Sequence, residues 1–114
     1  MTYAGQNFEM YLGDTKQVII TVYDENDAIL DLSGYDITWV LYKLTSKQIV
    51  LTKTLGSGIS VPAPSSGQIV IDILPVDTEN LVPNTYVHEC ELSSSPTDVS
   101  TITTGTVKLI YSRA

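Results

Sequence analysis

The chain is 114 residues long; 43% of the residues are hydrophobic and only 17% are charged. This length suits one compact domain over residues 1–114 and leaves no room for a second. Thirteen acidic and six basic residues give a formal net charge of −7. That charge disfavours binding to nucleic acid and to anionic membranes, because an acidic surface repels phosphate groups.

Other features of the composition narrow the cellular setting. There is no apolar run of about 18 residues, so no membrane-spanning helix is expected. Residues 1–7 lack the basic and apolar regions of a signal peptide. Cys90, the single cysteine, has no partner for an internal disulfide. The domain is therefore expected to be stable when reduced, as in a protein made and assembled in a cytoplasm.

Apolar and polar residues alternate along the first half of the chain, a pattern typical of half-buried β-strands. Polar turns at residues 24–27 and 31–34 separate the runs. The strands predicted in this half cover residues 8–12, 16–23 and 35–42, and residues 28–30 form a short apolar return. The side chains expected to face the core are those of Val18, Ile20, Val22, Ile37, Trp39 and Leu41. Trp39, the only tryptophan, is the predicted centre of that core.

The second half continues the pattern, with glycine and proline marking the breaks. The strands predicted here cover residues 48–54, 59–61, 68–74, 86–92 and 99–111. The side chains expected to face inward are those of Ile69, Ile71 and Ile73. Lys53, near the end of its strand, indicates a sheet edge, and residues 93–98 are predicted to form a loop. Asp77 is placed to cap a helical turn over residues 76–81, and Gly105 fits a bulge. Seven or eight short strands with almost no helix predict an all-β sandwich.

The segment over residues 77–92 is the most informative for topology. It indicates a turn that leads into a strand with Tyr86 at its start. In Greek-key β-sandwiches, a tyrosine in this place covers the edge of the core where the chain crosses between sheets. Its hydroxyl bonds back to the preceding chain. Alternation puts two sets of residues on opposite faces of the strand: Tyr86, His88, Cys90 and Leu92 on one, Glu89 and Glu91 on the other.

Four acidic residues gather around the turns after the second strand: Asp24, Glu25, Asp27 and Asp31. Oxygen-rich loops of this kind can bind Ca²⁺. This one lacks the EF-hand pattern of alternating ligands, a glycine and a distal glutamate. Acidic turns are also ordinary in any acidic protein, so the sequence favours solvated turns and assigns no metal site.

His88 and Cys90 share one strand face and are candidates for chemistry. They would supply two ligands of a zinc site, but Zn²⁺ takes about four and no other pair is evident. As a nucleophile pair they would need a third orienting group and an exposed thiol. The face that they share with Tyr86 and Leu92 predicts burial of Cys90. His88 is expected to be part-buried and hydrogen-bonded within the sheet.

No other pattern points to catalysis. The run Gly56-Ser57-Gly58 is too short for a phosphate-binding loop, and no lysine or helix follows it, so a flexible turn is expected. The chain has no Gly-x-Ser-x-Gly elbow. The prediction is a protein that is not an enzyme, with no catalytic residue, no cofactor and no bound metal.

Tyrosines and outward-facing apolar residues indicate contact surfaces instead. Six of the seven tyrosines fall at strand ends or on predicted outer faces: Tyr3, Tyr11, Tyr23, Tyr35, Tyr42 and Tyr111. Four apolar residues also fall on nominal outer faces: Ile19, Val40, Val70 and Leu74. Tyrosine is common both in interfaces and in ordinary strand packing. Strands that are apolar on both sides indicate a second surface that is covered by something.

Short motifs spread over nearly the whole chain resemble a known family. In order they are Gly13-Asp14-Thr15, Asp31-Leu32-Ser33-Gly34-Tyr35, Leu51-Thr52-Lys53-Thr54, Gly58-Ile59-Ser60-Val61, Ser66-Gly67-Gln68, Asp77-Thr78 to Leu81, Tyr86 and Gly105. The pattern resembles the small immunoglobulin-like domains of tailed-bacteriophage virions and is similar to the N-terminal domain of upper baseplate proteins. The resemblance implies an immunoglobulin-like antiparallel β-sandwich of seven to eight strands with Greek-key connections.

The same resemblance implies a structural role in the virion, in the tail, baseplate or neck. The chain would assemble in the host cytoplasm and dock to other virion proteins, as a homo-oligomer or in multiple copies. Upper baseplate proteins continue into a helical, fibre-anchoring region, whereas this chain ends at Ala114, so an adaptor, plug or decoration is expected. Two alternatives stay open: a capsid decoration or cement protein, and a carbohydrate-binding module, which a Trp39 in the core disfavours.

The N-terminal segment through Leu12 has two possible pairings. It joins the domain's own sheet or reaches to a neighbouring subunit, as donated strands do. The second pairing predicts that deletion of residues up to Gly13 weakens assembly more than folding.

Overall fold

The computed structural model describes residues 7–111, which fold into eight strands and two short helical turns. The strands are β1 (Phe8–Tyr11), β2 (Lys16–Thr21), β3 (Asp36–Lys43), β4 (Ile49–Leu55), β5 (Gly58–Ser60), β6 (Gln68–Ile73), β7 (Asn84–Ser95) and β8 (Asp98–Ile110). The helical turns are a 3₁₀ turn at Pro64–Ser66 and α1 (Pro75–Thr78). The strands form one continuous sheet in the order β1-β8-β7-β3-β4-β5-β6-β2. The prediction of an all-β chain is confirmed.

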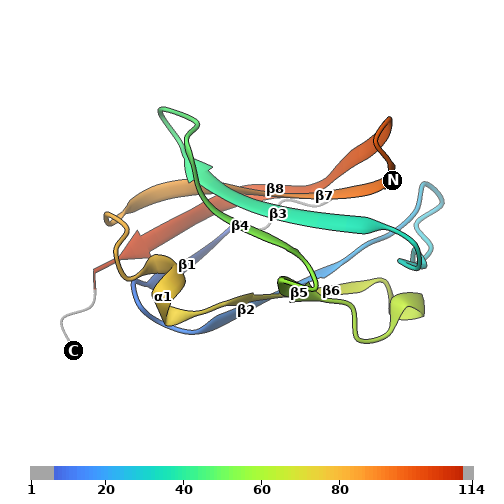
Figure 1. Cartoon of the computed structure of the whole chain (residues 1–114), viewed down its shortest axis with the longest axis horizontal. Helices are drawn as coiled ribbons and strands as arrows, with labels where there is room; N and C mark the ends of the chain where they lie inside the picture. Colours follow the sequence, from blue (N-terminus) through green and yellow to red (C-terminus); the bar gives the residue numbers. More distant parts are fainter. Residues whose placement is uncertain (1–6, 112–114) are drawn as a thin grey trace.

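The sheet curls so that its two halves face each other and nearly close into a barrel (Figure 1). One half holds β3, β4, β7 and β8, and the other holds β2, β5 and β6 (Figure 1). Apolar side chains fill the space between the halves, because alternate residues of each strand point inward. The predicted inward residues are all buried: Val18, Ile20, Val22, Ile37, Trp39, Leu41, Ile69, Ile71 and Ile73. Alternation therefore identified the core correctly.

The sheet is mixed, so the expectation of a purely antiparallel sandwich is wrong at two pairings. β1 runs parallel to β8, and β5 runs parallel to the end of β4. At the second pairing the chain turns tightly at Gly56 and Ser57 and then continues beside itself, with Thr54 paired to Gly58. Because β5 also pairs with β6, this turn carries the chain from one half of the sheet to the other. Alternation fixes which side chains face inward, but it does not fix strand direction.

β1 belongs to the domain's own sheet and core. Its four residues pair in register with the C-terminal part of β8. Met10 is buried, and the Phe8 ring lies 5.4 Å from the ring of His88. Deletion up to Gly13 removes this packing, so we expect it to destabilise the fold; its relative effect on assembly stays a prediction. Residues 1–6, and Tyr3 with them, lie outside the described residues.

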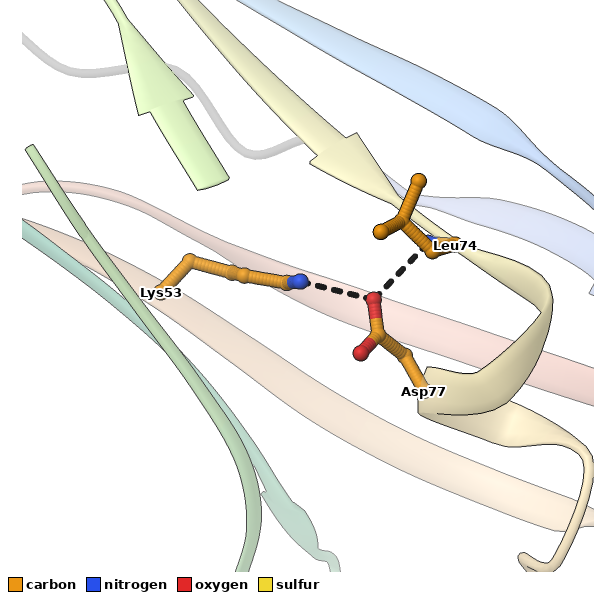
Figure 2. A network of polar contacts seen from close by, with 3 residues as sticks. All are labelled: Lys53, Leu74 and Asp77. Carbon is orange, nitrogen blue, oxygen red and sulfur yellow. Dashed lines mark hydrogen bonds and ion pairs between the residues drawn. The ribbon is translucent and has the colours of Figure 1, made fainter. Parts of the chain in front are cut away.

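Lys53 lies on a part of β4 that pairs with β3 alone, because β4 meets β5 only at Thr54 and Leu55, so the predicted edge position holds for the backbone. The side chain, however, lies inside the molecule. It is 10% exposed, and its ammonium lies 2.7 Å from the carboxylate of Asp77 (Figure 2). The same carboxylate oxygen accepts a hydrogen bond from the Leu74 N–H at 2.8 Å (Figure 2). The lysine is buried because a carboxylate on α1 neutralises it there. Gly58 leaves room for the lysine, since a Cβ at that position would overlap its side chain.

The helical turn covers Pro75–Thr78 and not the predicted residues 76–81. Its N-cap is Leu74, and Asp77 is the third residue of the turn. Asp77 caps the turn from there, because its carboxylate accepts the hydrogen bond from the Leu74 N–H. The Asp77 N–H in turn donates to the Leu74 carbonyl at 2.9 Å. Pro75 suits the first helical position, because the N–H that proline lacks would have no partner there.

Tyr86 forms the predicted corner at the start of β7. Its side chain is buried, and its hydroxyl donates a 2.7 Å hydrogen bond to the carbonyl of Val82, four residues earlier. Burial raises the pKa of this phenol. The corner holds the loop that brings the chain from α1 into the opposite half of the sheet.

Tyr86→Phe is expected to lower the free energy of unfolding by about 1–2 kcal/mol, because the ring still fills the core while the Val82 carbonyl loses its donor. Urea denaturation followed by circular dichroism measures the change. Tyr111→Phe is the control, because Tyr111 is 66% exposed. Loss of its hydroxyl is expected to change the free energy of unfolding by less than about 0.5 kcal/mol. Equal losses in the two variants would contradict a role for the corner.

Two local features differ from the sequence prediction. β7 runs to Ser95 and β8 begins at Asp98, so Pro96 and Thr97 alone form the turn where a loop over residues 93–98 was expected. The bulge in β8 lies at Ile102, which the register skips, whereas Gly105 pairs regularly. Residues 28–30, expected as a short apolar return, form one isolated bridge, between Ile29 and Tyr23. Serine- and threonine-rich strands carry no hydrophobic alternation, so periodicity does not separate them from loops.

Candidate protein-interaction face

A hollow of about 360 Å³ lies on the outer surface of β3, β4 and β7. Strand register builds it: Thr38 lies opposite Glu91, and Val40 lies opposite Glu89. The residues that line the hollow are Thr38, Val40, Tyr42, Lys47, Ile49, Glu89 and Glu91. Together these seven residues form the β3–β7 face.

A register shift between β3 and β4 brings Ile49 onto the β3–β7 face. Leu41 pairs with Leu51, but the next residue of β3, Tyr42, pairs with Ile49, so the register skips Val50. Ile49 is 55% exposed, whereas Val50 packs partly against the core. Regular alternation would have placed Val50 beside Tyr42. The shift instead places the larger isoleucine there, and the face gains apolar area.

Tyr42 and Glu89 hold each other in place on this face. The Tyr42 hydroxyl donates to Glu89 Oε1 at 2.9 Å. Partial burial, then the hydrogen bond and negative charge of Glu89, raise the pKa of the phenol. The Lys47 ammonium lies 5.9 Å from the centroid of the Tyr42 ring, within cation–π range. The Glu91 carboxylate makes no hydrogen bond or ion pair with another described residue.

The outer surface of the other half carries a second apolar patch. Ile19 of β2 pairs with Val70 of β6, and Ile19 is 50% exposed. Leu74, which follows β6, is also exposed. With Val40 on the β3–β7 face, the prediction of apolar side chains on both outer faces is confirmed.

The aromatic residues divide between surface and core. Tyr11, Tyr23 and Tyr111 are exposed, whereas Tyr35 packs partly against the core. Trp39 is fully buried, as predicted, so the only tryptophan of the chain offers no surface on which a sugar ring could stack.

His88 and Cys90 lie on the inner side of β7, and both are fully buried. The Trp39 Nε1–H donates a 3.0 Å hydrogen bond to His88 Nδ1, so the histidine is neutral with Nδ1 as the acceptor. The prediction that His88 is hydrogen-bonded within the sheet is confirmed, although its burial is complete and not partial. Burial, and to a lesser extent the charge of Glu91, raises the pKa of the Cys90 thiol to about 12. This geometry does not offer a thiolate to solvent.

Cys90 is expected not to react with a thiol reagent such as DTNB while the protein is folded. With a pKa of about 12, only roughly one thiol in 10⁴ is ionised at pH 8, and the sulfur is enclosed. In concentrated guanidinium chloride the same reagent should titrate one thiol per chain. Rapid reaction of the folded protein would instead show that β7 opens locally.

Two of the acidic turn residues, Asp24 and Asp31, accept hydrogen bonds within their own turns. Asp24 Oδ1 accepts hydrogen bonds from the N–H groups of Asn26 and Ala28, at 2.8 and 3.0 Å. Asp31 Oδ1 accepts from the N–H and the hydroxyl of Ser33, and these hydrogen bonds lower the pKa of Asp31. Among residues 7–111, no group of three or more His, Cys, Asp or Glu side chains is placed to hold a metal ion.

Sequence reasoning identified part of the β3–β7 face. It placed Val40 and Tyr42 on an outer face and pointed Glu89 and Glu91 away from the core, and the structure confirms these placements. It did not predict that these four residues share one face, because that depends on which strand pairs with β3. It missed Ile49 as a surface residue, because nothing in the sequence marks the register shift.

Within the described part of the chain, no helix is long and apolar enough to cross a membrane. Neither a family model nor a curated protein matches this sequence.

Proposed function

We propose that this chain is a non-enzymatic structural component of a tailed-phage virion, an adaptor in the tail, baseplate or neck that acts through protein–protein interfaces. The observation that carries the proposal is that both outer faces of the curled sheet bear half-exposed apolar side chains, Ile49 on one and Ile19 on the other. Large uncovered apolar patches on a soluble protein mark contact sites. A subunit held between neighbours in a particle would cover both faces.

The proposal includes an immunoglobulin-like β-sandwich with Greek-key connections as the fold. The division of the strands supports it, with β2, β5 and β6 on one side and β3, β4, β7 and β8 on the other. Two side chains support it further. Trp39 of β3 packs in the core against β7, and Tyr86 forms a corner at the start of β7, as the tryptophan and tyrosine of immunoglobulin domains do.

The partners in this proposal are other virion proteins, with the chain present in several copies around a symmetry axis. A stable interface takes about 800 Å² from each partner. The molecule exposes 6575 Å², so two such interfaces would cover about a quarter of its surface. Docking through both faces is therefore possible for a domain of this size.

Mass spectrometry of purified particles tests the proposal. Particles of the phage that encodes the chain are separated into heads and tails, and both fractions are digested and quantified. Peptides of the chain in the tail fraction, at a fixed ratio to tail proteins, support the proposal. Their presence in heads alone replaces it with capsid decoration, and their absence from intact particles overturns it.

Two matched variants connect incorporation to the β3–β7 face. Ile49→Asp places a charge in the hollow, whereas Val99→Asp places the same charge at a site of similar exposure, 53% against 55%. Both should fold, which circular dichroism checks. Ile49→Asp is expected to reduce incorporation into particles by about tenfold and Val99→Asp to leave it unchanged. Equal incorporation of the two variants would remove this face from the proposal.

A further inference from the structure

The hollow of the β3–β7 face combines an apolar floor with carboxylates along one wall. Val40 and Ile49 supply the apolar part, and Glu89 and Glu91 lie on the neighbouring strand. Alternate residues of a strand are about 7 Å apart, so the two carboxylates flank the same space. Such a surface fits a side chain with an aliphatic stem and a cationic head, which is the shape of lysine and arginine.

The two carboxylates are not equivalent. Glu89 already accepts the hydrogen bond from the Tyr42 hydroxyl at 2.9 Å. Glu91 is part-buried, yet its carboxylate makes no hydrogen bond or ion pair within the described residues. A carboxylate that has lost some of its water and lacks a partner is stabilised when a cationic donor reaches it. Glu91 is therefore the charge that can anchor a ligand.

The position of Lys47 indicates that this part of the hollow attracts cations. Its ammonium lies 5.9 Å from the Tyr42 ring centroid. A guanidinium arriving in the hollow would compete with Lys47 for that ring. Arginine can stack its flat guanidinium on tyrosine and also form paired hydrogen bonds with a carboxylate, whereas an ammonium presents a point charge.

We infer that the β3–β7 face receives an arginine side chain of its docking partner. The aliphatic stem lies on Val40 and Ile49, and the guanidinium lies between Glu91 and the Tyr42 ring. The inference rests on the proposed function for the existence of a docked protein, and it adds the chemistry of that protein's contact. The net charge of −7 adds a long-range attraction for a basic surface, which salt weakens.

Titration of the ¹⁵N-labelled full chain with N-acetyl-arginine-N-methylamide, followed by NMR, tests the inference. The matched probe is N-acetyl-citrulline-N-methylamide, which has nearly the same shape and no charge. The arginine probe is expected to shift the amides of Thr38, Val40 and Glu91 in a saturable way at millimolar concentrations, and citrulline is expected not to. Equal shifts with both probes, or shifts elsewhere on the sheet, would overturn the inference.

Three variants sharpen the test. Glu91→Gln should weaken binding of the arginine probe about threefold or more, whereas Glu79→Gln removes the same charge near α1 and should change nothing. Lys47→Asn should strengthen binding, because it removes the competing ammonium. Asparagine suits the position, since Lys47 has a φ of +64° and asparagine tolerates that conformation. Unchanged binding in Glu91→Gln would contradict the assigned anchor.

Failure of this inference and failure of the proposed function give different results. If the arginine probe does not bind but particles still exclude Ile49→Asp, the face docks a partner by other contacts and only the arginine is wrong. If the probe binds as expected but the chain is absent from particles, the chemistry of the hollow stands and the virion role does not.

Discussion

Asp77→Ala is expected to lower the free energy of unfolding by about 3–5 kcal/mol, because it leaves a buried ammonium without its partner. The Lys53 side chain is 10% exposed, and Asp77 is 2.7 Å away. The change also removes the acceptor for the N–H of Leu74, the N-cap of α1. Domains of this size are stabilised by about 5–15 kcal/mol in total, so the loss is a large part of the whole.

Urea denaturation at fixed salt measures this loss, and two further variants separate its parts. Lys53→Met keeps the aliphatic stem and leaves the Asp77 carboxylate bonded to Leu74, so a smaller loss of about 1–2 kcal/mol is expected. The pair Lys53→Met with Asp77→Asn removes both charges and keeps a capping oxygen, so it should lie closer to the native protein than Asp77→Ala does. If Asp77→Ala costs no more than Lys53→Met, the ion pair does not hold α1 to β4.

Trp39→Phe is expected to destabilise the protein by about 3 kcal/mol, which combines a core cavity with an unsatisfied acceptor on His88. Trp39 is fully buried, and its indole N–H donates to His88 Nδ1 at 3.0 Å. His88 is also fully buried, so no solvent can replace the lost donor without structural change. Thermal and urea denaturation measure the loss.

A double-mutant cycle isolates the contribution of the hydrogen bond. His88→Leu leaves the indole N–H without an acceptor, and the pair Trp39→Phe with His88→Leu removes donor and acceptor together. The cost of the double variant is expected to be about 1–2 kcal/mol less than the sum of the single costs. Simple additivity of the two single changes would show that the bond contributes nothing beyond packing.

Strands β3 and β7 carry the hydrogen-bonded pair Trp39 and His88 on their inner side and the proposed docking face on their outer side. Trp39 and Cys90 lie opposite each other facing inward, while Val40 and Glu89 lie opposite each other facing outward. The geometry of a binding surface on paired strands depends on the packing of the side chains beneath it. Loss of the Trp39–His88 bond is therefore expected to weaken binding at the face as well as stability.

Local pattern determined much of the protein. Alternation with a period of two identified the buried side of each major strand, because side-chain direction in a strand follows from the backbone alone. The local pattern also predicted the Tyr86 corner and the burial of Cys90, since both features depend on residues close in sequence. The Asp24 and Asp31 turns are local in the same sense, with carboxylates that bond to the next few N–H groups.

Tertiary structure decided the rest, which depends on contacts between segments far apart in the chain. Lys53 lies on an edge segment of β4, as expected, but Asp77, brought near by the curl of the sheet, pairs with its side chain inside the molecule. Ile49 reaches the surface through a register shift, and Glu89 meets Tyr42 only because β7 pairs with β3. The sequence alone determines which side chains lie on each face of a strand. Which faces meet, in which direction and at what register follows from the packing of the whole chain, because a local pattern is compatible with several pairings.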